Sequence, residues 1–137
     1  MKKLFFVFVF FTGIFFVQAQ FQPFRFAFIS DTHIGSPDGK AEEDLRRTVA
    51  DINKMSDISF AVITGDITEF GTDAEIKAAK QIFDSLKVAW YIIPGNHDAG
   101  WSESGGVTFI KVFGYDKFSF EYEGIRFLGC ASGLTKE

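Results

Sequence analysis

The sequence predicts an α/β fold in which a parallel sheet of strand–helix–strand units is followed by an antiparallel hairpin. Three short apolar segments, at residues 24–30, 59–64 and 88–93, have the length and the composition of buried strands. Amphipathic helical patterns lie between them, and a helical crossover makes the two strands that it joins parallel. A later segment of alternating apolar and polar residues predicts the hairpin.

The first helix is predicted over residues 41–55. Leu45, Val49 and Ile52 recur at helical spacing. Three acidic residues lie near the start, where the positive end of the helix dipole stabilises negative charge. We therefore expect one apolar face that packs on the sheet.

The second helix is predicted to begin at Thr72, which forms a capping box with Glu75. Its apolar face comprises Ile76, Ala79, Phe83 and Leu86. The strand before this helix ends at Gly65-Asp66, and the strand after it ends at Pro94-Gly95. Both dipeptides are typical of turns.

The hairpin is predicted over residues 117–128, with Glu123-Gly124 as its turn. Phe and Tyr alternate with polar residues before the turn, so one face of the hairpin is wetter than the other. We expect it to start a second sheet. The preceding segment, 104–106, is interpreted as a flexible loop because no helix signal follows it.

Residues 1–19 have the pattern of a secretory signal peptide. Two lysines precede an apolar run over residues 4–17, and Ala19 offers a cleavage site. The run is shorter than the roughly 20 residues that cross a bilayer core. We expect export to the periplasm or out of the cell, and a mature domain over residues 20–137 with no stable membrane anchor. The alternative is an uncleaved N-terminal anchor.

Composition excludes several classes of function. The chain carries 18 acidic and 14 basic residues, so no nucleic-acid partner is expected. One cysteine, Cys130, excludes an internal disulfide framework and is interpreted as a buried small apolar residue. His33 and His97 are the only histidines, so any metal site must depend mainly on oxygen ligands.

Polar side chains follow all three predicted parallel strands, at the point where each strand ends. They are Asp31, His33, Asp66, Asn96, His97 and Asp98. The carboxyl ends of parallel strands share one edge of the sheet, where ligands bind. Carboxylate, amide and imidazole groups are ligands for divalent metal ions. The sequence therefore predicts a metal site at this edge, although each residue taken singly also fits an ordinary loop or turn.

The three blocks, Ser30-Asp31-Thr32-His33, Thr64-Gly65-Asp66 and Pro94-Gly95-Asn96-His97-Asp98, resemble the first three motifs of the calcineurin-like metallophosphoesterases. Each short motif alone is weak, but here all three occur in order and each follows a strand. The resemblance runs from Phe24 to Asp98. It implies an α/β/β/α metallophosphoesterase sandwich, with the hairpin as the beginning of its second sheet.

The resemblance also implies roles for these residues. Asp31 and His33 would bind a first metal ion, Asp66 would bridge two ions, and Asn96 would bind the second. The expected cofactors are two divalent metal ions, with Mn, Fe or Zn as the candidates. The two ions would activate water for attack on a phosphate ester.

Two catalytic residues are implied as well. His97 would face the scissile phosphate, where it stabilises charge or protonates the leaving oxygen, and Asp98 would orient His97 through a hydrogen bond. The expected substrate is a small phosphate mono- or diester. Purple acid phosphatases carry an iron-binding Tyr at the position of Glu69, so the resemblance favours the bacterial cyclic-nucleotide phosphodiesterase-like branch.

One departure from the family bears on activity. The family completes its site with a further His and a Gly-His-x-His motif, whereas this sequence has no His after His97. We therefore expect the N-terminal portion of a longer, exported phosphoesterase, poorly active or inactive alone. The alternative is a non-catalytic fragment or binding module that keeps half of the metal site. The oligomeric state is left open.

Overall fold

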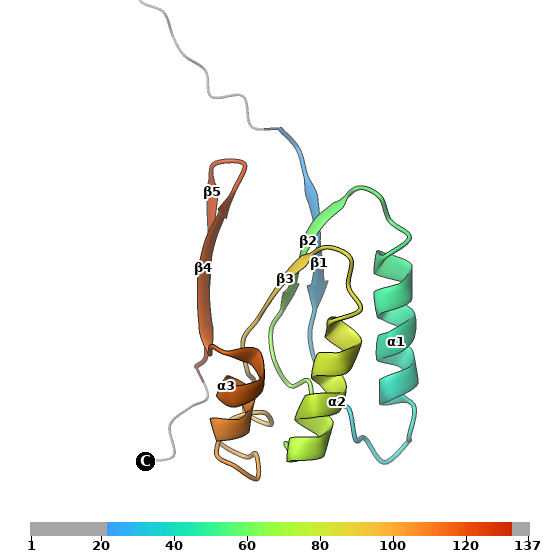
Figure 1. Cartoon of the computed structure of the whole chain (residues 1–137), viewed down its shortest axis with the longest axis vertical. Coiled ribbons are helices and arrows are strands. Elements are labelled where there is room, and N and C mark those ends of the chain that lie inside the picture. The colour runs from blue at the N-terminus through green and yellow to red at the C-terminus, as the bar shows by residue number, and fades with distance from the viewer. Residues whose placement is uncertain (1–21, 133–137) are drawn as a thin grey trace, which may run out of the picture.

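The computed structural model describes residues 22–132 of the chain. Strands β1 (Arg25–Ile29), β2 (Ile58–Ile63) and β3 (Ala89–Ile92) form one sheet in the order β1-β2-β3 (Figure 1). Both pairings are parallel, with Ile63 opposite Ile29 on one side and Ile92 on the other. The predicted parallel strand–helix–strand arrangement is confirmed.

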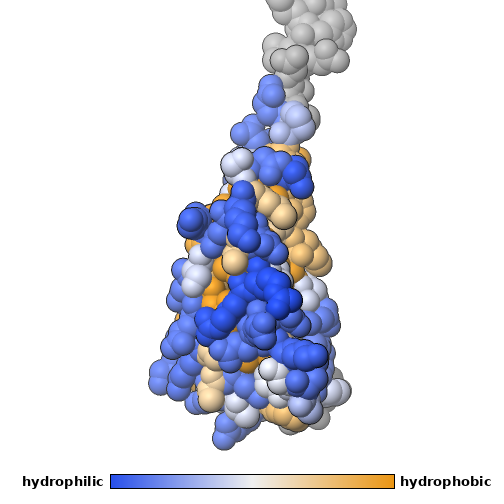
Figure 2. Space-filling view, turned by 90° about the vertical axis from the view of Figure 1, so that its right-hand side faces the viewer, coloured by the Kyte–Doolittle hydropathy of each residue, from blue (hydrophilic) through white to orange (hydrophobic). Residues whose placement is uncertain are grey.

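Helices α1 (Ala41–Ile52) and α2 (Asp73–Phe83) lie together on one face of this sheet (Figure 1). Helix α1 buries Leu45, Val49 and Ile52, as its spacing predicts. The outer side of α1 carries ion pairs between residues four apart. Hydrophilic side chains predominate on the side of the molecule where the helices lie (Figure 2).

The predicted capping box forms at the start of α2. The Thr72 hydroxyl accepts a hydrogen bond from Glu75 N at 3.2 Å, and the Glu75 carboxylate accepts one from Thr72 N at 3.0 Å. The same carboxylate accepts a further bond from Phe70 N at 3.2 Å. Leu86 lies beyond the end of the helix but is still buried. The cap therefore fixes where the loop after β2 turns into α2.

Strands β4 (Lys117–Tyr122) and β5 (Ile125–Cys130) form the predicted antiparallel hairpin, a separate sheet on the side opposite the helices (Figure 1). Aromatic rings pack between the two sheets. The Phe120 ring stacks on Tyr91 at 3.7 Å and lies 5.1 Å from the Phe60 ring. Helices, parallel sheet and hairpin thus form the successive layers expected of the N-terminal part of the sandwich.

Helix α3 (Val107–Phe113) contradicts the expectation that no helix follows the 104–106 loop. Left-handed glycines flank it, Gly106 at φ +91° and Gly114 at φ +86°, and its N-cap residue, Gly106, has no side chain with which to cap the start. Its Phe109 and Phe113 are buried in the core. Tertiary packing stabilises this short helix, which is why local start signals do not mark it.

Cys130 is exposed, so the interpretation of a buried cysteine is wrong. Successive residues of a strand point to opposite faces of the sheet. Phe127 and Gly129 are partly buried on one face of β5, which places Cys130 on the other.

Within residues 22–132, no helix is both long and apolar enough to cross a bilayer. The predicted signal peptide, residues 1–19, lies outside the described residues.

The aromatic layer between the two sheets can be tested with Phe60, which is 2% exposed. Phe60→Ala is expected to lower the free energy of unfolding by about 3–5 kcal/mol, because it removes a ring that packs against aromatic rings of both sheets. Phe28→Ala is the matched control, since Phe28 is 65% exposed, and it is expected to cost less than about 1 kcal/mol. Urea denaturation measures both, and equal losses would contradict the packing described here.

Candidate metal centre

The pairing of β1 with β2 continues into the loops that follow them. Asp31 N donates to Gly65 O at 3.1 Å, and His33 N donates to Asp66 O at 3.1 Å. Ile34 N then donates to the carbonyl of a further residue of the second loop at 2.9 Å. Main-chain hydrogen bonds therefore hold the first two motifs side by side, as the parallel sheet predicts.

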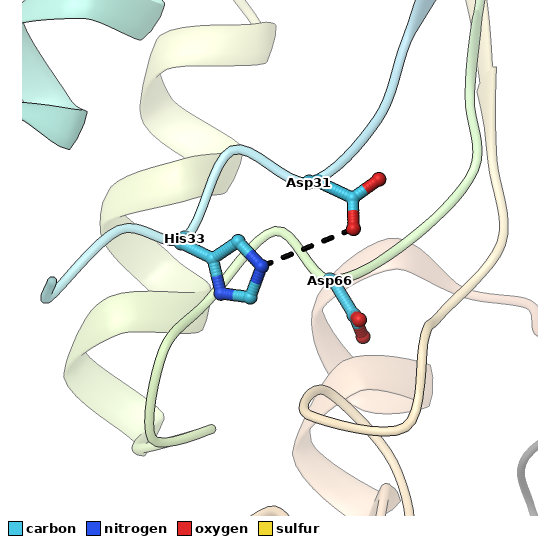
Figure 3. Close-up of side chains that lie close together, drawn as sticks. All are labelled: Asp31, His33 and Asp66. Carbon is cyan, nitrogen blue, oxygen red and sulfur yellow. Dashed lines mark ion pairs between the residues drawn. The ribbon is translucent and has the colours of Figure 1, made fainter.

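Asp31, His33 and Asp66 bring their side chains together at this edge (Figure 3). One ligand atom from each lies within 4.8 Å of the others. His33 Nε2 lies 3.9 Å from Asp31 Oδ1, and the Ser30 hydroxyl donates a hydrogen bond to the other oxygen of Asp31. The three side chains can reach a common ion.

The same three residues have a left-handed backbone. Their φ angles are +56° at Asp31, +43° at His33 and +47° at Asp66, and Glu123 in the hairpin turn is the one other non-glycine residue with positive φ among residues 22–132. Such backbone is costly for a residue with a side chain and persists where the surrounding structure imposes it. The concentration of left-handed residues in this cluster points to a functional role for it.

The third motif joins the cluster through a close contact between two glycines. A Cβ on Gly65 would lie 2.2 Å from Gly95 N, and a Cβ on Gly95 would lie 2.0 Å from an Asp66 carboxylate oxygen. Only glycine allows this approach at both positions. Asn96 consequently shares a pocket of about 230 Å³ with Asp31 and Asp66. The structure thus brings Asp31, Asp66 and Asn96 to one edge, as the sequence predicts.

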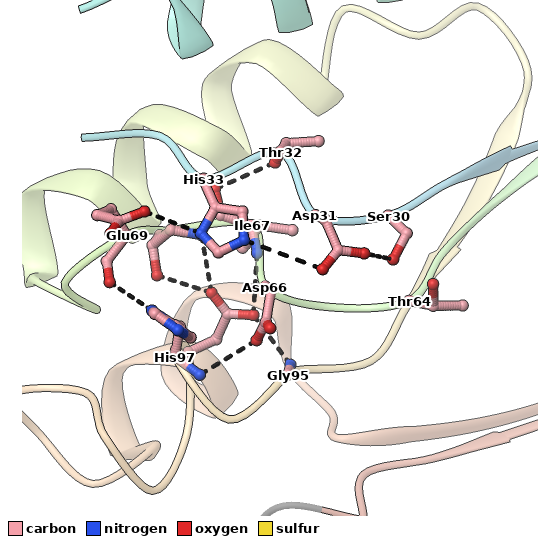
Figure 4. A network of polar contacts seen from close by, with 12 residues as sticks. Ser30, Asp31, Thr32, His33, Thr64, Asp66, Ile67, Glu69, Gly95 and His97 are labelled. Atoms are coloured by element: carbon pink, nitrogen blue, oxygen red, sulfur yellow. Dashed lines mark hydrogen bonds and ion pairs between the residues drawn. The ribbon is translucent and has the colours of Figure 1, made fainter. Parts of the chain in front are cut away.

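His97 lies beside this cluster. Its main-chain N–H donates to an Asp66 carboxylate oxygen at 3.2 Å, which orients that carboxylate. Its ring lies 5.1 Å from the His33 ring, and its Nδ1 donates to the main-chain carbonyl of Glu69 (Figure 4). Nδ1 is therefore occupied, and Nε2 is the ring nitrogen left for chemistry.

Asp98 does not form the expected hydrogen bond to His97. It is 0% exposed, and its carboxylate accepts bonds from Ile67 N at 3.1 Å, Thr68 N at 3.0 Å and Gly95 N at 2.9 Å. The Thr68 hydroxyl donates a fourth bond at 2.7 Å. These four donors satisfy the buried carboxylate, which is why it does not bind His97, and Asp98 thereby cross-links the second and third loops.

The chemistry of the cluster suits a divalent cation. Two carboxylates and an imidazole meet there, and Asn96 lines the same pocket as the carboxylates; together these residue types are a ligand set that Mn, Fe and Zn accept. Among the described residues, the linings of this pocket and of the adjoining 490 Å³ pocket beside α1 include no Lys or Arg. As lined by residues 22–132, neither pocket therefore offers a Lys or Arg to balance the charge of a phosphate, which favours metal ions in that role.

Two residues near the site have roles that sequence reasoning missed. The Glu69 carboxylate lies 3.0 Å from His33 Nδ1. Trp101 is 68% exposed, with its ring 5.1 Å from the His97 ring. The contact of Glu69 with His33 depends on the fold of the loop and has no local signal in the sequence.

Comparison with known proteins agrees with this geometry. The family model for calcineurin-like phosphoesterases matches residues 24–134. The chain belongs to the calcineurin-like phosphoesterases. The match covers both sheets, so the hairpin is part of the phosphoesterase domain as well as the three motifs.

Two relatives of this phosphoesterase are similar over about half of the chain. A probable glycerophosphodiester phosphodiesterase, GpdQ, from Arcobacter nitrofigilis is 40% identical over 77 residues, which are 51% of this chain and 28% of that protein. A probable cyclic nucleotide phosphodiesterase from Fibrobacter succinogenes is 41% identical over 75 residues, 51% of this chain and 29% of that protein. The chain matches less than a third of the length of either relative.

The Asp98 cross-link is testable with an isosteric change. Asp98→Asn places an NH₂ group against main-chain N–H donors, and it is expected to lower the free energy of unfolding by at least about 2 kcal/mol. Asp57→Asn is the control, because it removes an exposed ion pair with Arg25 that is worth about 1 kcal/mol or less. Urea denaturation measures both, and similar losses would show that the Asp98 bonds are unimportant.

Proposed function

We propose that this phosphoesterase is exported and hydrolyses small phosphate mono- or diesters with water and two divalent metal ions. The observation that carries the proposal is the meeting of Asp31, His33 and Asp66 within 4.8 Å, with Asn96 lining the same pocket as Asp31 and Asp66. Family membership supports hydrolysis of phosphoric esters. The leader pattern in residues 1–19 supports export to the periplasm or beyond.

Asp31 and His33 would hold one ion, Asn96 the other, and Asp66 both. Mn, Fe and Zn are the candidates, because this ligand set combines oxygen with one imidazole. Bound ions of this kind supply Lewis acidity and positive charge for the attack of water on phosphorus. The hydrogen bond from His97 N holds one Asp66 oxygen in place.

His97 is the candidate proton donor. The attacking water gives one proton to solvent as its oxygen bonds to phosphorus, the bond from phosphorus to the leaving oxygen breaks, and that oxygen takes a proton from Nε2 of His97, which regains it from solvent. The Glu69 carbonyl fixes the ring by binding Nδ1. Asp98 contributes indirectly, since it holds the loop that carries Gly95 and His97.

The substrate class follows from the relatives and the pocket charge. Both relatives are named as phosphodiesterases, which supports a small phosphodiester. The net charge of −4 argues against a nucleic-acid partner. The names of the relatives differ in the alcohol that the phosphate carries, so we propose the class and not one ester.

A second function, a binding module that keeps half of a metal site, is favoured by the ligand count. Asp31, His33, Asp66 and Asn96 are four side chains for two ions, and each ion prefers about four to six ligands. Reading the coding DNA past Glu137 separates the two functions. An open frame with a later Gly-His-x-His favours the enzyme, whereas an immediate natural stop favours the module.

Asp66→Ala tests the catalytic proposal on the natural gene product. Mn²⁺-dependent hydrolysis of bis-p-nitrophenyl phosphate is expected to fall by more than about 100-fold, since losing even an outer-shell partner of a metal ligand costs about 10–100-fold. Asp57→Ala removes a carboxylate at the opposite end of β2 and should leave the rate unchanged. Unchanged turnover in Asp66→Ala would overturn the proposed mechanism.

A further inference from the structure

Glu69 contacts both histidines of the candidate site, each through a different group. Its carboxylate lies 3.0 Å from His33 Nδ1, and its main-chain carbonyl accepts a hydrogen bond from His97 Nδ1 (Figure 4). The two imidazole rings are 5.1 Å apart and nearly perpendicular. One residue therefore faces the Nδ1 side of both rings.

The His33 contact is the informative one. His33 Nδ1 is buried and has no hydrogen bond of good geometry, although the carboxylate oxygen is within bonding distance. Buried polar atoms are normally satisfied, and a carboxylate is a strong acceptor for an imidazole N–H. A hydrogen bond from Nδ1–H to this carboxylate would satisfy the buried nitrogen, which places the proton of neutral His33 on Nδ1.

The other nitrogen of His33 then carries the lone pair. Nε2 faces Asp31, with 3.9 Å between Nε2 and Asp31 Oδ1. Metal-binding histidines commonly donate their second ring N–H to a carboxylate, which fixes the tautomer and the ring orientation. Free histidine in water favours the opposite tautomer, with the proton on Nε2, so the protein must select this form.

Glu69 is itself firmly placed. Its main-chain N–H donates to Ile34 O at 2.8 Å, and the next residue, Phe70, donates to the Glu75 carboxylate of the α2 cap. Its side chain is 28% exposed, and among the described residues its ion pair is with His33. It is not part of the group of atoms within 4.8 Å formed by Asp31, His33 and Asp66, so the geometry makes it a neighbour of a ligand and not a ligand.

We propose that Glu69 is a positioning residue that holds His33 as the Nδ1–H tautomer and presents Nε2 for metal binding. The inference rests on the proposed metal site. The Glu69 main-chain carbonyl likewise holds His97 as the Nδ1–H tautomer. This contact survives any change of the Glu69 side chain. His97 is therefore an internal control within the same protein.

The test combines two measurements on the full chain. Two-bond ¹H–¹⁵N correlation NMR of the metal-free protein, at a pH of about 9 where imidazole is neutral, identifies the tautomer of each histidine. Calorimetric titration with Zn²⁺ measures metal affinity. The variants are Glu69→Ala, Glu69→Gln, whose amide oxygen still accepts a hydrogen bond, and Glu103→Ala, which removes an exposed acid on the loop after β3.

We expect both histidines of the wild type to be Nδ1–H tautomers. In Glu69→Ala, His33 should lose this preference while His97 keeps it, and Zn²⁺ affinity should fall by about 10–100-fold. Glu69→Gln should retain the His33 tautomer and lose less affinity than Glu69→Ala. Glu103→Ala should change neither readout.

An Nε2–H tautomer at His33 in the wild type would overturn the proposal without any variant, even if Glu69→Ala does not fold. Equal losses of affinity in Glu69→Ala and Glu103→Ala would also overturn it, since they would indicate a general effect of charge. A wild-type chain that holds His33 as Nδ1–H but binds no Zn²⁺ supports the positioning role and contradicts the proposed metal site.

Discussion

The buried carboxylate of Asp98 is the interaction on which the arrangement of the site depends. It accepts hydrogen bonds from main-chain N–H groups of the loop after β2 and of the loop after β3. An anion removed from water is stable only when such donors replace its hydration. Main-chain pairing joins the loops after β1 and β2 in the same way. The three loops therefore form one unit, and Asp31, Asp66 and Asn96 meet because that unit is rigid.

Rigidity allows the site to hold conformations that isolated loops would lose. Positive φ at Asp31, His33 and Asp66 costs on the order of 1–3 kcal/mol for each residue, and it persists because the surrounding pairing imposes it. Gly65 and Gly95 let the second and third loops approach within contact distance. The converging carboxylates repel one another, and a divalent cation relieves that repulsion. The charge of the cluster thus favours a bound cation.

The fold was predictable where the local sequence pattern favours the same element that tertiary packing stabilises. The strand runs are short, apolar and bounded by turn residues, and the α1 face and the Thr72 cap have helical spacings. Asp31, Asp66 and Asn96 were predictable as neighbours because parallel strands place their carboxyl ends together. Helix α3 was not, since glycines bound it and packing of Phe109 and Phe113 stabilises it.

The remaining contacts of the site depend on how loops close in space. Nothing local distinguishes a buried Asp98, satisfied by four donors, from an acid that orients a neighbouring histidine. Cys130 is exposed because of the register of β5, and one residue of shift would reverse its burial. The contact of Glu69 with His33 likewise arises from the path of the chain between β2 and α2.

The central claim is that side chains after two different strands bind one cation. Anomalous diffraction from crystals grown with Mn²⁺ tests it most directly. The account requires a peak in direct contact with His33 Nε2 and with carboxylate oxygens of Asp31 and Asp66. A peak on the Nδ1 side of His33, or none at this edge of the sheet while Mn²⁺ is bound elsewhere, would contradict it.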